Sequence, residues 1–82
     1  MNRIVQMNHF SQRVELDVRH LPPPEPMVRI LEATATLAPQ IDLIVWHNRI
    51  PTLLYPRLAE RGLQVETTER SDGVIQLTIR RP

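Results

Sequence analysis

The residues best suited to chemistry in this 82-residue chain follow two apolar segments. Arg19 and His20 come after the first segment, and His47 and Arg49 come after the second. Glu25 stands where a helix is predicted to begin. Guanidinium groups bind anions through charge-assisted hydrogen bonds, and imidazole binds anions or metals. We therefore expect a binding site formed by these five residues.

Two kinds of ligand are consistent with this set. A small anion would use Arg19 and Arg49 together with the positive ends of two helices. A metal ion would use His20 and His47, but two imidazoles are too few for a closed site, and Glu25 or His9 would have to add a third ligand.

Inert roles for the same residues are equally consistent with the sequence. The arginines can pair with Asp17 or Asp42 on the surface, where ion pairs contribute little. Glu25 can occupy the positive end of the first helix, and each histidine can simply cap a strand.

Several catalytic chemistries are excluded by composition. The chain has no cysteine and no lysine, so thiol nucleophiles, thiolate metal ligands, persulfide carriage and lysine Schiff bases are impossible. The serines, Ser11 and Ser71, lie in the leader and in a hairpin turn, far from the strand ends that carry His20 and His47. The glycines, Gly62 and Gly73, form no phosphate-binding loop. We expect no catalytic residue and no enzymatic activity.

Charge and hydropathy restrict the partners. Ten arginines against nine acidic residues give a net charge of +1, which argues against nucleic-acid binding. No apolar run approaches the roughly 20 residues that cross a bilayer. The first residues lack the apolar core of a signal peptide, so we expect a cytoplasmic protein without a membrane anchor.

The predicted elements alternate between strand and helix. Apolar residues recur at every second position in residues 13–19, which predicts a strand. A helix is then predicted to begin in a proline-rich stretch and to end at Pro39. The prolines of this stretch are Pro22, Pro23, Pro24 and Pro26. A second helix follows Pro51 and ends at Gly62. The predicted strands cover residues 13–19, 42–47, 63–68 and 74–80, and the helices cover residues 26–38 and 51–61. Residues 1–12 are expected to be a leader, flexible or an edge strand, and residues 13–82 a single domain.

This order predicts an α+β two-layer sandwich. Right-handed crossovers place both helices on one face of a four-stranded mixed sheet with order 1-2-4-3. The C-terminal ends of the first two strands then lie beside the starts of both helices. In open α/β sheets, ligands usually bind at this edge. On the uncovered face, either Ile44 with Trp46 or Leu43 with Val45 points outward. Such a patch indicates a partner, a dimer or cover by the leader, unless long side chains such as Arg80 shield it.

Two segments resemble a known superfamily. Residues 16–26 (LDVRHLPPPEP) are similar to the signature of the TusA/SirA sulfur carriers, with Pro23 where their cysteine stands and Pro24 and Pro26 at their two prolines. Residues 51–62 (PTLLYPRLAERG) resemble the cysteine-less branch, the uncharacterised domain of unknown function 2249. The resemblance spans about residues 13–81.

The resemblance implies the same fold but not the same chemistry, because the sulfur atom is missing. It implies a small binding or adaptor module for a protein partner or small anion, accessory to redox or nitrogen-oxide metabolism. A metal-binding module using His20 and His47 is the alternative, and RNA binding follows only by analogy of fold. We expect a monomer or weak homodimer with Pro23, Pro24, Pro26, Pro51 and Gly62 in structural roles.

Overall fold

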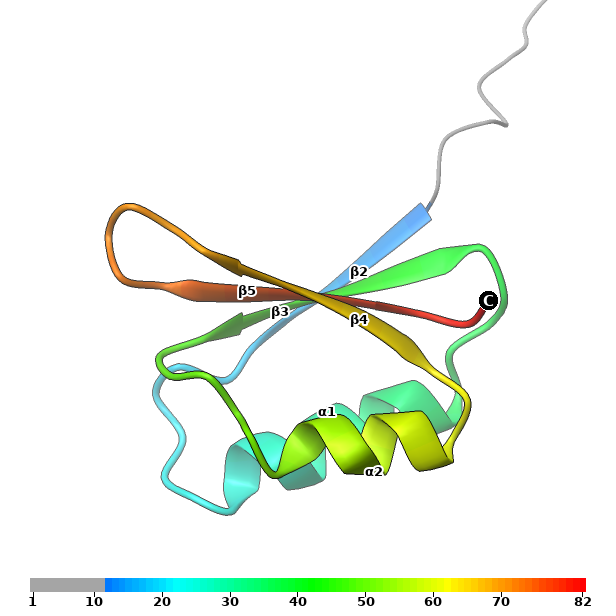
Figure 1. Cartoon of the computed structure of the whole chain (residues 1–82), viewed down its shortest axis with the longest axis horizontal. Helices are drawn as coiled ribbons and strands as arrows, with labels where there is room; N and C mark the ends of the chain where they lie inside the picture. Colours follow the sequence, from blue (N-terminus) through cyan, green and yellow to red (C-terminus); the bar gives the residue numbers. More distant parts are fainter. Residues whose placement is uncertain (1–11) are drawn as a thin grey trace, which may run out of the picture.

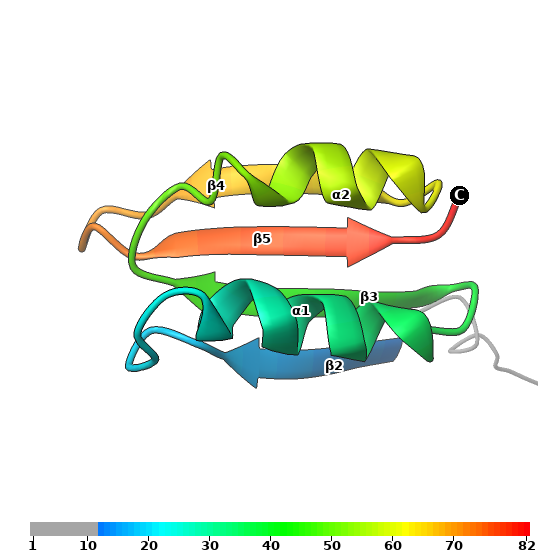
Figure 2. The same ribbon diagram turned by 90° about the horizontal axis from the view of Figure 1, so that it is seen from below.

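Six elements make up the computed structural model, which describes residues 12–82. The four strands form one sheet and both helices pack on the same face of it (Figures 1 and 2). The elements are β2 (Gln12–Asp17), α1 (Glu25–Ala35), β3 (Ile41–His47), α2 (Leu54–Glu60), β4 (Gln64–Glu69) and β5 (Ile75–Arg80). The expected two-layer βαβαββ sandwich is confirmed.

The sheet has the order β2-β3-β5-β4, as the sequence predicts. β2 pairs in parallel with β3, and β5 pairs antiparallel with both β3 and β4. The polar strand β4 and the strand β2 lie at the edges, and the apolar strands β3 and β5 lie between them. β2 and β3 therefore end side by side, next to the starts of both helices (Figure 2).

The predicted boundaries differ from the observed ones by a few residues. The first strand ends at Asp17 rather than residue 19, because Arg19 turns back to bond Asp17. The first helix ends at Ala35 rather than residue 38. Gln12, assigned to the leader, is the first residue of β2, and the prediction for residues 1–11 lies outside the described part of the chain.

The core lies between the sheet and the two helices. Leu43 and Val45 of β3 and Leu77 of β5 are fully buried there against Ile30 of α1 and Leu58 of α2. Burying each such side chain stabilises the fold by about 1.5–3 kcal/mol relative to leaving it exposed.

The other face of the sheet carries the second pair of apolar residues of β3. Ile44 is only 3% exposed, and Trp46 is half-buried. The Arg80 guanidinium pairs with Asp42 at 3.2 Å on this face. Trp46 Nε1 donates to Glu15 Oε1 at 3.2 Å, and the Arg70 guanidinium carbon lies 5.6 Å from the centroid of the indole ring. Long polar side chains therefore shield the face.

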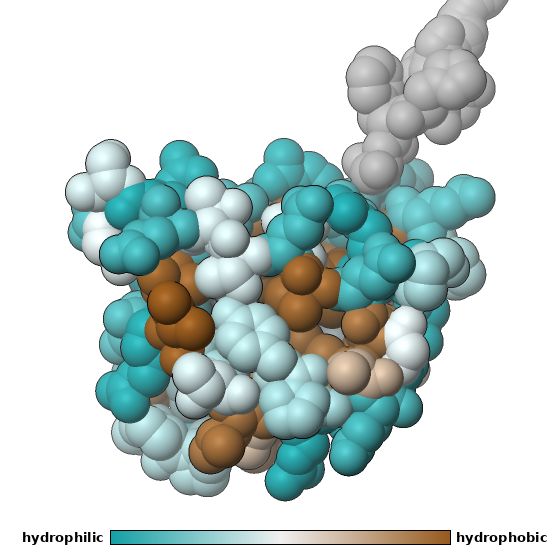
Figure 3. Space-filling view, viewed as in Figure 1, coloured by the Kyte–Doolittle hydropathy of each residue, from teal (hydrophilic) through white to brown (hydrophobic). Residues whose placement is uncertain are grey.

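Surface hydrophobicity is concentrated elsewhere. Ile50 and Leu53, on the loop from β3 to α2, are 49% and 75% exposed. Figure 3 shows hydrophobic patches among hydrophilic surface on the side of the molecule where this loop runs. In residues 12–82, no helix is both long and apolar enough to cross a membrane.

Candidate functional site

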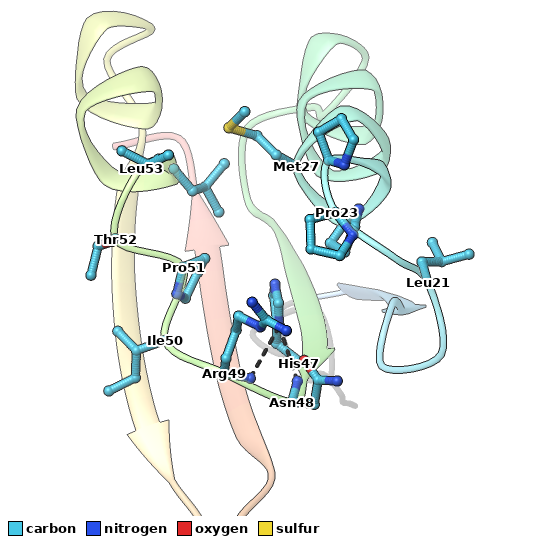
Figure 4. Close-up of a pocket in the computed structure, with 13 residues that line it drawn as sticks. Leu21, Pro23, Met27, His47, Asn48, Arg49, Ile50, Pro51, Thr52 and Leu53 are labelled. Carbon is cyan, nitrogen blue, oxygen red and sulfur yellow. Dashed lines mark hydrogen bonds between the residues drawn. The ribbon is translucent and has the colours of Figure 1, made fainter.

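A cavity of about 250 Å³ opens between the starts of the two helices. Figure 4 shows Pro23 and Met27 on the α1 side, Pro51 and Leu53 on the α2 side, and His47 with Arg49 at the end of β3. Most of its wall is apolar. The lining residues are Leu21, Pro23, Pro24, Pro26, Met27, His47, Asn48, Arg49, Ile50, Pro51, Thr52, Leu53 and Leu54.

The α1 side of the cavity is built by the proline-rich segment. The amide of Leu21 donates to the Val18 carbonyl at 3.2 Å, which turns the chain away from the end of β2. Pro26 occupies the first turn of α1, where its fixed φ suits a helix and its missing N–H is not needed. The peptide bond between Pro23 and Pro24 is cis. Because each proline ring fixes its own φ, the prolines of this segment form a preset apolar wall.

His47 is the buried polar group of the cavity. As the last residue of β3 it points to the helix side, opposite Ile75, and it is only 4% exposed. Its Nδ1 accepts hydrogen bonds from the backbone amides of Asn48 at 3.0 Å and Arg49 at 3.3 Å (Figure 4). Because Nδ1 is an acceptor, the proton of the neutral ring resides on Nε2.

The protonation of His47 follows from this environment. Burial lowers its pKa below the ordinary value, and the positive charge of Arg49 lowers it further, against an opposing contribution from the Asn48 side chain. Protonating Nδ1 would also break two backbone hydrogen bonds. At neutral pH His47 is therefore a neutral ring with one N–H donor.

The predicted site residues do not converge on one cluster. His47 and Arg49 line the cavity, whereas Arg19, His20 and Glu25 do not. His20 is an exposed turn residue.

Arg19 and Glu25 have local partners instead. The Arg19 guanidinium donates to both carboxylate oxygens of Asp17, at 2.9 and 2.7 Å. These bonds lower the pKa of Asp17 to about 2. Glu25 accepts a hydrogen bond from Arg29 at 3.3 Å, one turn along α1. Both side chains therefore have the local partners that a surface role would give them, and their predicted part in binding stays a prediction.

The predicted structural residues lie where the sequence places them. Pro23, Pro24, Pro26 and Pro51 line the cavity between the helix starts. Gly62 has a φ of 71° just after α2, the left-handed conformation that terminates helices. Its amide donates to the Ala59 carbonyl at 3.0 Å.

The helix starts have fewer free amide groups than an anion site requires. Pro24 and Pro26 carry no N–H group. The amides of Glu25 and Leu54 already donate to the Pro22 and Pro51 carbonyls, each at 2.9 Å. α2 has only seven residues. A bound anion would therefore depend mainly on side-chain donors.

The metal interpretation stays a prediction. Over residues 12–82, no group of three or more His, Cys, Asp or Glu side chains could hold a metal ion. His47 has only Nε2 left for coordination, because Nδ1 serves the backbone. His9 lies outside the described residues.

Several apolar residues of the cavity were missed by reasoning from the sequence. Leu21, Met27, Ile50 and Leu53 are absent from the predicted site, yet they line the cavity. The available signal was the presence of Ile50 and Leu53 in a loop, where large apolar residues have no core to enter. Asn48 was also missed, and its Nδ2 donates to the Arg19 carbonyl at 3.0 Å, which joins the two loops.

Comparisons with known proteins agree with this architecture. The family described as "Uncharacterized conserved protein (DUF2249)" matches residues 15–81. This chain belongs to that family. The crystal structure of a SirA-like protein from Desulfitobacterium hafniense superimposes with a TM-score of 0.68 at 25% identity, covering 79% of this chain and 92% of that one. No curated protein matches the sequence.

Proposed function

We propose that this DUF2249 protein is a non-catalytic binding module whose ligand enters the cavity between the helix starts. The observation that carries the proposal is His47, a buried N–H donor in a predominantly apolar wall. Ligand sites in proteins combine concave apolar surface with a few directed polar groups. The cavity has this composition.

The state of His47 favours binding over catalysis. A general base needs a free lone pair on its imidazole. In His47 the Nδ1 lone pair is directed to two backbone amides, and Nε2 carries the proton. The ring can therefore orient a ligand, but it is not prepared to remove a proton from one.

The relation to SirA-like proteins supports the same location. The resemblance places Pro23 where sulfur carriers have their cysteine, and Pro23 lines the cavity. The cavity thus lies at the position where the sulfur carriers have their cysteine, in a chain that has no cysteine. We propose that the site has kept recognition without group transfer.

Small-molecule titration followed by amide NMR tests the proposal. We expect toluene, an apolar probe, to shift the amides of residues 47–54 more than those of the sheet. Ile50→Ser should weaken this response, because Ile50 is a half-exposed residue of the wall. Val14→Ser is the matched control, since Val14 is equally exposed but lies outside the cavity. A response spread evenly over the protein would contradict the proposal.

Metal binding through His20 and His47 is the alternative that the same spectra examine. Zinc ions should shift the rings of both residues if they coordinate metal. Zinc-induced shifts confined to exposed His20 would exclude the pair, because a shared site requires Nε2 of His47.

A further inference from the structure

We propose that the cavity selects small apolar carboxylates, with the carboxylate at His47 and Arg49 and the hydrocarbon body against the prolines. The inference rests on the proposed function, because it specifies the ligand of that same cavity. Three properties of the cavity support this ligand class: an unpaired hydrogen-bond donor in its wall, the positive charge of the wall, and the volume of the cavity.

The unpaired donor is Nε2–H of His47. The hydrogen bonds to Nδ1 leave the proton on Nε2, and the residue is only 4% exposed. Within residues 12–82, the hydrogen bonds of the His47 ring are those that Nδ1 accepts, and none has Nε2 as its donor. Buried donors in proteins are almost always hydrogen-bonded. An oxygen atom of the ligand would complete the pairing.

The charge of the wall is positive. Arg49 is the charged residue among those that line the cavity, and no Asp or Glu of the described chain lies in its wall. Among residues 12–82, Arg49 forms no ion pair. A carboxylate would accept from a neutral imidazole N–H and from a guanidinium, both of which bond oxygen anions well. The acceptor is therefore expected to be anionic.

The size and the apolar character of the rest of the wall favour an organic anion over a bare inorganic one. A cavity of roughly 150 Å³ holds benzene. About 250 Å³ accommodates one aromatic ring with a short side chain. Pro23, Pro26, Pro51 and Met27 present carbon to such a ring. Sulfate and phosphate would leave this surface wet, so we expect them to bind weakly.

Amide and imidazole NMR with two probes of one skeleton tests the inference at constant ionic strength and neutral pH. The probes are phenylacetate and 2-phenylethanol, which differ in the carboxylate. We expect phenylacetate to bind at least tenfold more tightly, and to shift the Nε2–H resonance of His47 and the amides of residues 48–54. Sulfate at the same concentration should leave these resonances unchanged.

Two variants assign the contacts. Arg49→Gln removes the charge from an exposed position and should reduce phenylacetate affinity to near that of 2-phenylethanol. His47→Asn keeps an acceptor near the Nδ1 position for the two backbone amides but removes the Nε2–H donor. Arg57→Gln is the control, because Arg57 is an exposed arginine outside the cavity wall.

The possible results distinguish a failure of the carboxylate preference from a failure of the binding module itself. Equal binding of phenylacetate and 2-phenylethanol in the cavity would overturn the carboxylate preference and leave the binding module intact. Absence of any response to phenylacetate, 2-phenylethanol and toluene would overturn both. If His47→Asn fails to fold, Arg49→Gln decides alone, and phenylacetate affinity unaffected by that change overturns the inference.

Discussion

The C-terminal end of α1 is capped by an arginine from the far end of the chain. Arg81 Nε donates to the Leu37 carbonyl at 2.7 Å, and Arg81 Nη2 donates to the Thr34 carbonyl at 3.0 Å. The last turn of α1 contains no basic residue of its own. Carbonyls at a helix C-terminus lack partners within the helix and carry partial negative charge. Arg81 supplies both donors and charge.

The magnitude follows from these two bonds. A typical hydrogen bond contributes about 0.5–1.5 kcal/mol, and because Arg81 is partly exposed and the Thr34 carbonyl already accepts from the Leu37 amide at 3.2 Å, we assign about 1 kcal/mol to the two bonds together. The favourable charge at a helix end contributes about 0.3–1 kcal/mol. We therefore expect Arg81→Met, which keeps an apolar stem, to reduce the free energy of unfolding by about 1–2 kcal/mol. For a domain of this size the melting temperature should fall by about 4–16 °C.

Thermal and urea denaturation followed by circular dichroism measure this change. Arg13→Met is the control, because it removes an exposed arginine of β2 for which the described structure shows no ion pair. Arg81→Lys should lie between the wild type and Arg81→Met, since it keeps the charge and loses the paired geometry. Hydrogen exchange should accelerate at the end of α1. If Arg81→Met reduces the free energy of unfolding no more than Arg13→Met does, Arg81 does not stabilise the end of α1 as we infer.

Three further predictions concern the site. The pKa of His47 is lowered from 6.5 in the folded protein, so the unfolded chain takes up the proton first as the pH falls. The free energy of unfolding should therefore decrease as the pH drops below about 6.5, which urea unfolding at several pH values measures. His47→Asn should make the free energy of unfolding less dependent on pH in this range. Pro26→Ala should lower the free energy of unfolding by about 0.4–1 kcal/mol by freeing the unfolded chain, visible as a lower urea midpoint. Incubation with a persulfide donor should add no sulfur to the mass of the protein, and a stable gain of one sulfur atom would contradict the loss of carrier chemistry at Pro23.

The fold was predictable because its signals are local and repeated. Val14, Leu16 and Val18 alternate, and so do Ile75, Leu77 and Ile79. These patterns, with right-handed crossovers, determine the order of the sheet. The orientation of β3 was not predictable, because its apolar run has no alternation. Pairing with β5 decides it, by placing Val45 beside Leu77 on the helix side.

The structure brings some of the predicted site residues into one cavity and leaves others outside it. The ends of two parallel strands and the starts of two helices do meet, and His47 and Arg49 do line the cavity there. Arg19 lies outside the cavity wall, and its guanidinium is paired with the carboxylate of Asp17, two residues earlier. Sequence spacing shows which residues come near an edge, but it does not show which side chains are already paired.

The prolines explain why the cavity offers few backbone amides to an anion at the start of α1. Pro24 and Pro26 mark the start of α1 in the sequence, and helix starts ordinarily offer amide donors. The same residues lack the N–H groups that such donation needs, and they present carbon instead. Recognition of a polar ligand atom must then come from a side chain held in the wall. His47 meets this requirement because two backbone amides occupy Nδ1, so that its remaining N–H is directed by the fold and not by solvent.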